Sequence, residues 1–224
     1  MWGPVAEAFY ADPGTLGIMP TVDFFAERYR VHGPRREALD WSEQGQQTRF
    51  RVLAEAADFE GRSVLDIGCG LGDFLPFLEA RFGKVAYTGF DFFAPFIEHA
   101  RAKHPQGRFE VRDVLRDPFP EVDLVVSSGL HNIPTGENEA EMVALFRKAF
   151  GAAREAVAVN MLSTRADRRD DGRAYFVPER MLAAAQEISR YAVLRHDYLP
   201  HDFTLYLYRE RRGAAVTGTP AAGR

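Results

Sequence analysis

Residues 64–74, with the sequence VLDIGCGLGDF, carry the clearest structural signal in this chain. An apolar run passes through Asp66, and glycines then occupy positions 68, 70 and 72 before a helical stretch begins. Glycine allows a sharp backbone turn and lets a ligand approach the main chain where a Cβ would obstruct it. A strand, a glycine turn and a helix in this order are typical of open α/β sheets, which bind ligands at the carboxyl ends of their strands.

Short apolar runs alternate with amphipathic stretches on both sides of this turn. Strands are predicted at 63–67, 85–90, 108–112, 122–128, 156–161 and 191–195. Helices are predicted at 73–82, 95–104, 137–150 and 178–189. Pro95 and Pro178 fall in first helical turns, where a missing N–H is tolerated. The alternation predicts an α/β fold with a parallel, doubly wound sheet.

The carboxyl-terminal part departs from this alternation. Two strand-like runs, 191–197 and 203–209, are separated by about six residues that include Pro200. So short a connection predicts a hairpin, and the last strand is therefore expected to run antiparallel to its neighbour.

The two ends of the chain are expected to flank one core domain at 61–212. Helical periodicity near 22–30 and 43–58 predicts that residues 1–60 form a helical cap over the carboxyl edge of the sheet, within the same domain. The small, unpatterned residues 213–224 are expected to form a disordered tail.

Composition excludes several classes of protein. The 224 residues include 28 Lys and Arg against 32 Asp and Glu, a net charge of −4 that argues against non-specific coating of nucleic acid. The sequence contains no run of about 18 apolar residues, so no membrane-spanning helix is predicted. The N-terminus lacks a signal peptide pattern, and a cytoplasmic location is therefore expected. The single Cys69 excludes an internal disulfide, and no zinc-ligand spacing is present, so no metal is expected.

Acidic side chains end the first three predicted strands, at Asp66, Asp91 and Asp113. A carboxylate in the place of Asp91 can accept hydrogen bonds from both hydroxyls of a ribose. The carboxylate of Asp113 can accept a hydrogen bond from an adenine amine. The alternative is that Asp113 caps a helix. Position 73 is Asp where the dinucleotide fingerprint requires Gly, and the charge of Asp66 favours an ammonium or sulfonium over a pyrophosphate. The pattern predicts a nucleoside site, with Phe92 or Phe93 as a wall for the purine.

The motifs LDIGCGLG, GFD and RDV, with VDLVVSSGLHNI as a fourth, resemble those of the class I S-adenosylmethionine-dependent methyltransferases over roughly residues 40–210. The opening DFFAERYRVHGPRREALDW is similar to the N-terminal lid of a bacterial group of these enzymes. The resemblance implies S-adenosyl-L-methionine as the cofactor. It also implies a Rossmann-like sheet of seven strands in the order 3-2-1-4-5-7-6, with the seventh strand antiparallel.

The resemblance further implies roles for single residues. Gly68, Gly70 and Gly72 would approach the methionine moiety, with Asp66 near its amino group, Asp91 on the ribose and Asp113 on the adenine. The expected cofactor-binding residues are Asp66, Gly68, Cys69, Gly70, Gly72, Asp91, Phe92, Asp113, Val114, Ser128 and Arg49. Arg49 has two interpretations, a fork onto the carboxylate of the methyl donor or a surface arginine on the helix 43–58.

Candidates for the acceptor side follow the fourth and sixth strands. His131 is the residue near the end of the fourth strand whose ordinary pKa suits proton transfer at neutral pH, and we predict it as the catalytic base. A hydrogen bond to a loop carbonyl is the alternative. Tyr29, Tyr198 and His201 are the expected substrate contacts. The segment 196–202 is rich in His and Asp, for which turn capping and substrate contacts are favoured over metal binding.

Together these features predict a methyltransferase that modifies a small-molecule acceptor, at oxygen or nitrogen more than at carbon. A pocket enclosed by the N-terminal helices, the loop 129–136, the hairpin 196–203 and the stretch 163–175 is expected. One alternative is the same fold methylating RNA or protein, which the acidic charge and the lack of an Asn/Asp-Pro-Pro-aromatic run disfavour. A non-catalytic nucleoside-binding module is the other. The sequence leaves the accepting atom and the oligomeric state open.

Overall fold

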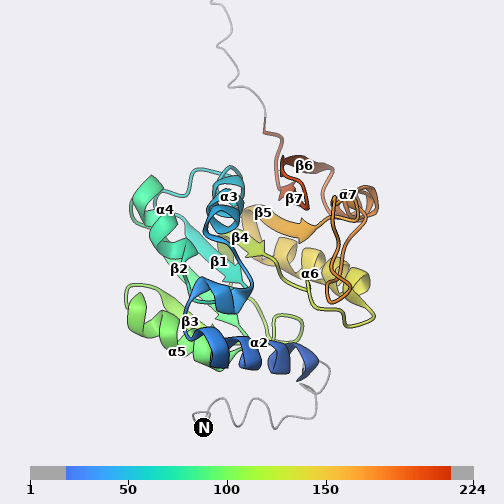
Figure 1. Ribbon diagram of the computed structural model, residues 1–224. Helices are drawn as coiled ribbons and strands as arrows, with labels where there is room; N and C mark the ends of the chain where they lie inside the picture. Colours follow the sequence, from blue (N-terminus) through green and yellow to red (C-terminus); the bar gives the residue numbers. More distant parts are fainter. Residues whose placement is uncertain (1–18, 213–224) are drawn as a thin grey trace, which may run out of the picture.

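The computed structural model describes residues 19–212, which build a seven-stranded sheet with helices on both faces (Figure 1). The strands are β1 (Ser63–Ile67), β2 (Ala86–Asp91), β3 (Arg108–Val111), β4 (Val122–Ser128), β5 (Ala153–Leu162), β6 (Tyr191–Leu199) and β7 (Asp202–Tyr208). The helices are α2 (Met19–His32), η2 (Arg36–Leu39, a 3-10 helix), α3 (Glu43–Leu53), α4 (Phe74–Phe82), α5 (Ala94–Lys103), α6 (Asn138–Ala152) and α7 (Pro178–Gln186).

The strand order is β3-β2-β1-β4-β5-β7-β6, and β7 is antiparallel to both β5 and β6. The predicted order, the antiparallel last strand and the Rossmann-like α/β class are therefore confirmed. Because β1 to β5 are parallel, the carboxyl ends of β1, β2, β3 and β4 lie along one edge of the sheet.

Alternate residues of each strand enter two separate apolar layers, as the pleat of a β-strand requires. Val64 and Leu124 pack with residues of α3, α4 and α5 on one face. Leu65 and Val125 pack with residues of α6 and α7 on the other. Figure 1 shows the same division of the helices between the two sides of the sheet. Both faces of the central strands are thus buried, which explains their nearly continuous apolar sequence.

Among the boundaries that differ from the predictions, two lie in the hairpin and the cap. The hairpin turn contains only Pro200 and His201, in place of about six residues, because β6 continues to Leu199 across a register irregularity after Arg195. Helix α3 ends at Leu53, with Ala54 as its C-cap, and does not continue to residue 58. The chain turns back toward β1 there instead of extending the cap.

The cap contacts the start of α5 through aromatic side chains of α2. The rings of Phe25 and Tyr29 pack against those of Phe93 and Phe96, which follow β2. Residues 1–18 of the expected cap and the predicted tail 213–224 lie outside the described residues. None of the helices within 19–212 is long and apolar enough to cross a membrane, and the cytoplasmic location stays a prediction.

The glycine turn after β1 is built from left-handed backbone conformations. Gly68, Gly70 and Gly72 have φ values of 76°, 54° and 77°. A Cβ on Gly72 would lie 2.8 Å from the ring of Phe109 and 3.2 Å from the Cβ of Ala100. Gly72 therefore lets the turn pack against β3 and α5, in addition to allowing the backbone conformation.

We expect Gly72→Ala to lower the free energy of unfolding by about 2–5 kcal/mol, from a left-handed Ala at about 1–2 kcal/mol plus the clash with Phe109 at about 1–3 kcal/mol. Gly61→Ala is the matched control, because Gly61 has a φ of 69° and a Cβ there would meet nothing within 4 Å. Urea unfolding of both variants measures the difference. Equal losses of unfolding free energy in the two variants would show that the ring of Phe109 moves aside without an energetic cost.

Candidate active site

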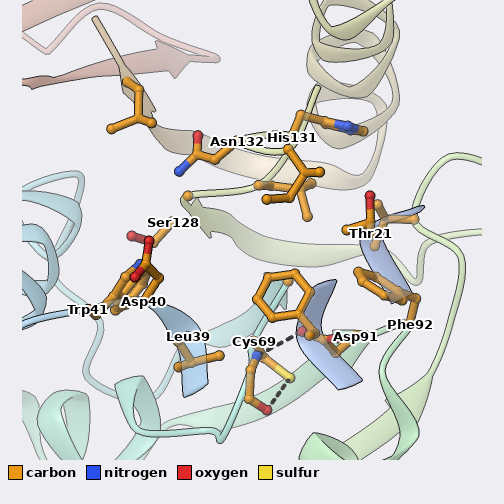
Figure 2. A pocket seen from close by; sticks show the side chains of 18 of the residues that line it. Thr21, Leu39, Asp40, Trp41, Cys69, Asp91, Phe92, Ser128, His131 and Asn132 are labelled. Atoms are coloured by element: carbon orange, nitrogen blue, oxygen red, sulfur yellow. Dashed lines mark hydrogen bonds between the residues drawn. The ribbon is translucent and has the colours of Figure 1, made fainter. Parts of the chain in front are cut away.

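A cavity of about 480 Å³ opens at the carboxyl ends of β1, β2 and β4 (Figure 2). Ten of the predicted cofactor-binding residues line it: Asp66, Gly68, Cys69, Gly70, Asp91, Phe92, Asp113, Val114, Ser128 and Arg49. Gly72 is not among the lining residues. In Figure 2, Asp91 and Cys69 form the floor, Phe92 and Thr21 lie on one side, and Trp41 and Asp40 lie on the other. Thr21 and Asp40 were not identified from the sequence.

Asp91 holds the glycine turn in place. Its Oδ2 accepts a hydrogen bond from the backbone N–H of Gly70 at 2.9 Å, and its Oδ1 accepts from that of Phe93 at 2.9 Å. Burial raises the pKa of Asp91 to about 6, and the backbone hydrogen bonds oppose this rise. One carboxylate thus joins the turn after β1 to the segment after β2 while facing the cavity.

Asp66 is a second buried carboxylate on the floor. The hydroxyl of Tyr87 donates a hydrogen bond to its Oδ2. Burial raises the pKa of Asp66 to about 7; the Tyr87 hydrogen bond lowers it, and the neighbouring charge of Asp91 adds to the rise. Among the described residues, no Lys, Arg or His side chain forms an ion pair with Asp66, so its charge lacks a cationic partner within this part of the chain.

Asp113 caps a turn and also lines the cavity, and its role toward an adenine amine stays a prediction. Its Oδ1 accepts a hydrogen bond from the backbone N–H of Leu115 at 2.9 Å, so the side chain caps the turn after β3. It also lines the cavity. Of the two phenylalanines after β2, Phe92 lines the cavity, whereas Phe93 is 1% exposed and packs on Phe96. Only Phe92 is therefore placed to form a wall for a purine.

His131 lies on the opposite wall, beside α6 (Figure 2). Its Nδ1 is 3.2 Å from Oε2 of Glu141, and its Nε2 is buried without a hydrogen-bond partner among the described residues. The side-chain amide of Asn138 donates to the carbonyl oxygens of His131 and Ile133, at 2.8 and 2.7 Å, and fixes this loop. Glu141 lines the cavity as well, and the sequence gave no signal for it beyond its place near the start of a helix.

A family model described as a methyltransferase domain matches residues 64–156, which include the glycine turn and the ends of β1 to β4. The chain therefore contains a methyltransferase domain of the class I S-adenosylmethionine-dependent type. It is 29% identical over 166 residues to Rv1506c of Mycobacterium tuberculosis, a protein named provisionally as a methyltransferase; the match covers 70% of this chain and 96% of that protein. A fatty-acid O-methyltransferase of Mycolicibacterium smegmatis is 35% identical over 74 residues, which are 32% of this chain and 27% of that enzyme.

The fold of this methyltransferase is similar to that of solved structures of low sequence identity. The magnesium protoporphyrin IX methyltransferase of Synechocystis, solved with bound S-adenosylhomocysteine, superposes with a TM-score of 0.65. The superposition covers 87% of this chain and 100% of the other, at 15% identity. At this level of identity the likeness shows the fold alone, and the family assignment rests on the sequence matches.

In this methyltransferase Arg49 is buried rather than on the surface. Its Nε lies 2.5 Å from Oδ2 of Asp202, and its NH2 group lies 3.3 Å from Oδ1. The guanidinium carbon also lies 5.1 Å from the centre of the Trp41 ring. The surface interpretation of Arg49 is thus wrong. The fork that could hold a ligand carboxylate is engaged by Asp202 from β7.

Two of the three predicted substrate contacts lie outside the cavity of the methyltransferase. Tyr29 packs on the rings of Phe93 and Phe96, with ring centroids 5.9 and 5.8 Å away. The hydroxyl of Tyr198 forms a hydrogen bond with that of Thr204 at 2.8 Å, within the β6–β7 hairpin. His201, at the hairpin turn, does line the cavity.

The polar residues at 196–202 do not form one cluster. Successive residues of β6 point to opposite sides, so the ring of His196 packs against Phe203 while Asp197 pairs with Arg195. Within residues 19–212, no three His, Cys, Asp or Glu side chains are grouped so as to hold a metal ion.

The stretch 163–175 covers the cavity of the methyltransferase, as expected for a lid. Asp170, Arg173 and Tyr175 line the cavity. Arg173 forms an ion pair with Asp40, next to η2, and its guanidinium carbon lies 4.6 Å from the ring centre of Phe24. The lid segment is therefore bound to the cap through charge and aromatic contacts.

The raised pKa values of the floor predict how stability depends on pH. Between its ordinary pKa of 3.8 and its folded pKa of about 7, Asp66 is protonated in the folded protein and ionised in the unfolded chain. The folded state binds more protons, so its stability falls as the pH rises through this window, by at most about 1.4 kcal/mol per pH unit for one group. Between pH 5 and pH 8 the free energy of unfolding of the parent should therefore fall. We expect that of Asp66→Asn to fall by about 2 kcal/mol less.

Urea unfolding of the ligand-free protein at several pH values measures this effect. Asp197→Asn is the matched control, because Asp197 is exposed and Arg195 lowers its pKa, so it stays ionised throughout this range. Parallel stability curves for the parent and Asp66→Asn would contradict the assignment of a raised pKa to Asp66.

Proposed function

We propose that this protein binds S-adenosyl-L-methionine on the floor of the cavity and transfers its methyl group to a small-molecule acceptor, at oxygen or nitrogen. The observation that carries the proposal is that Asp66, Asp91 and Asp113, at or just after the ends of β1, β2 and β3, line a single cavity. These carboxylates offer partners to an ammonium group, a ribose and an adenine amine in the order in which a nucleoside carrying an amino acid would meet them.

The residues that line the floor fit such a cofactor. Asp66 is a buried carboxylate that forms no ion pair with a Lys, Arg or His among the described residues. An ammonium group of the cofactor would compensate its charge. Asp91 keeps further acceptor capacity on both carboxylate oxygens, since each can accept more than one hydrogen bond. Phe92 and Val114 supply apolar walls near Asp113, where a purine ring would be excluded from water.

When bound, S-adenosylmethionine supplies an electrophilic methyl group. The chain's own part in the reaction is to position the acceptor in line with it and to exclude water. Phe24, Leu130 and Ile133 line the cavity with apolar surface. His131 is the residue of this wall suited to accept a proton, and we assign it the role of the base.

The enclosure of the cavity supports an acceptor of small-molecule size. Residues of α2, the loop 129–136, the lid segment 163–175 and His201 all line it, and its volume lies within the range of small-molecule pockets. The formal charge of −4 does not favour a polyanionic acceptor such as RNA. Two of the similar proteins, the fatty-acid O-methyltransferase and the magnesium protoporphyrin IX methyltransferase, are named for small acceptors, which supports this part of the proposal.

We expect Asp91→Ala to weaken the binding of S-adenosylhomocysteine by at least about 100-fold. Two hydrogen bonds from ribose hydroxyls to an ionised group would be lost, each worth about 1.5–3 kcal/mol. Calorimetry on the folded variant measures the change, with Asp197→Ala as the control on exposed β6. If the variant binds S-adenosylhomocysteine with an affinity within twofold of the parent, Asp91 does not bind the ribose. If the parent does not bind S-adenosylhomocysteine at millimolar concentration, the proposed function is wrong.

Metal dependence provides a separate check. Because the cavity offers no grouped metal ligands among residues 19–212, S-adenosylhomocysteine binding is expected to be the same with and without excess EDTA. Loss of binding in EDTA that magnesium restores would show a metal site.

A further inference from the structure

The indole ring of Trp41 is seated against the main chain at the end of β4. Trp41 follows η2, and it lines the cavity on the same side as Ser128 (Figure 2). Gly129, the first residue after β4, makes room for the ring, because a Cβ on Gly129 would lie 3.2 Å from Cζ2 of Trp41. One edge of the indole therefore rests directly on the backbone that follows β4.

A buried cation covers one face of this ring. The guanidinium carbon of Arg49 lies 5.1 Å from the centre of the Trp41 ring. Asp202 fixes this guanidinium, with its Oδ2 at 2.5 Å from Nε and its Oδ1 at 3.3 Å from Nη2. The ring of Phe50 packs against the indole at an interplanar angle of 70°. Arg49, Phe50 and Gly129 together restrain the indole, and the surface that they leave open lines the cavity.

The guanidinium on one side of the ring decides which kind of group the open face of Trp41 attracts. A Trp ring attracts cations through the negative charge of its π face. A positive charge already placed over one face draws electron density toward itself and disfavours a second cation on the other face. The open face is therefore better suited to a neutral aromatic ring, whose stacking adds to the energy of apolar burial.

A hydrogen-bond donor lies beside the indole. The Cβ on Gly129 that would contact Trp41 would also lie 3.2 Å from Nδ2 of Asn132, so the amide and the indole border the same point. Oδ1 of Asn132 is buried, whereas Nδ2 is directed into the cavity and donates no hydrogen bond to a described residue (Figure 2). The opposite orientation of the amide would bury two unpaired N–H groups in place of one oxygen, so the nitrogen belongs on the cavity side.

We propose that the methyl acceptor carries a flat aromatic ring, which stacks on the open face of Trp41, and an oxygen substituent that accepts a hydrogen bond from Nδ2 of Asn132. The inference rests on the proposed function and deepens it by naming the class of acceptor. Trp41 and Asn132 are specificity-determining residues in this arrangement. Arg49 and Gly129 are positioning residues that act through the indole.

An acceptor with a flexible aliphatic chain fits this wall less well. Such a chain buries apolar area against the indole, but it adds no stacking energy and loses rotamer freedom when the cavity confines it. A flat ring is already rigid and meets the indole with its whole face. The wall of Trp41 therefore favours an aromatic acceptor over a saturated one of the same size.

The first test compares 2-naphthol with decahydro-2-naphthol, which share a carbon skeleton and a hydroxyl group and differ in aromaticity. Calorimetry on protein saturated with S-adenosylhomocysteine measures both affinities. We expect the parent to bind 2-naphthol about fivefold more tightly. In Trp41→Leu the two affinities should lie within about twofold of each other, because stacking is lost. Trp41→Phe keeps an aromatic face and should retain part of the preference.

Tyr191→Leu is the matched control for the loss of a ring beside an arginine. The guanidinium carbon of Arg190 lies 5.3 Å from the centre of the Tyr191 ring, and Tyr191 does not line the cavity. This variant should keep the preference of the parent. Equal affinities of the two probes in the parent, no binding of either probe, or an undiminished preference in Trp41→Leu overturns the proposal.

Asn132→Ala tests the polar contact separately. The substitution keeps the main-chain carbonyl of residue 132, which accepts a hydrogen bond from the N–H of Ala174 at 2.9 Å. We expect both probes to bind about fivefold more weakly, because each offers one hydroxyl oxygen to the amide. The ratio of the two affinities should stay that of the parent. No loss for either probe, or a loss for one probe alone, contradicts the role of Asn132.

NMR provides a measurement that leaves the wall unaltered. The sequence contains two tryptophans, Trp2 and Trp41, so Trp2→Phe leaves Trp41 as the single source of indole signals. A stacked naphthalene ring shifts the proton signals of the indole upfield through its ring current, which a saturated ring lacks. We expect this shift with 2-naphthol and none with decahydro-2-naphthol. Equal responses to the two probes would show that no ring stacks on Trp41.

These outcomes separate the inference from the proposed function. If S-adenosylhomocysteine binds but the aromatic preference is absent, the inference is wrong and the proposed function stands. If S-adenosylhomocysteine does not bind, the proposed function is wrong, while the NMR response of the ligand-free protein still reports whether an aromatic ring stacks on Trp41.

Discussion

The site depends on the carboxylate of Asp91, whose two oxygens accept the backbone N–H groups of Gly70 and Phe93. These bonds tie the turn after β1 to the segment after β2, which makes two neighbouring strand ends one rigid surface. The left-handed φ of Gly70 is stable there because its N–H has a buried, charged partner. Without this carboxylate, the glycine turn would lack the contact that aligns it with the cavity.

The same arrangement places negative charge where water is scarce. Asp66 and Asp91 are 5% and 6% exposed, and burial raises the pKa of both. Such groups reduce the stability of the ligand-free protein near neutral pH, and a bound cation would offset this cost. The floor is thus better matched to a ligand than to the empty state, a common property of binding sites that natural sequences retain.

The sequence predicted the floor well because its signals are local. Strand ends, the glycine turn and the acids beside them are set by a few consecutive residues, so Asp66, Asp91 and Asp113 were correctly expected at one sheet edge. The acceptor wall was predicted less well. Tyr198 was misplaced because the length of β6 determines which residues face the cavity, and pairs such as Arg49–Asp202 join residues from opposite ends of the chain.

The two halves of the cavity therefore follow different physical rules. The floor is formed by strand ends and backbone N–H groups, whose geometry the parallel sheet fixes. The opposite wall is formed by loops, and it becomes rigid only through contacts to packed elements: Asn138 holds the loop carbonyls, and Glu141 holds the ring of His131. Substitutions in such a wall can change the acceptor without disturbing the sheet. The positive φ of His131, at 57°, shows that this wall is held in a conformation that its surroundings must enforce, and the side chains of α6 supply that constraint.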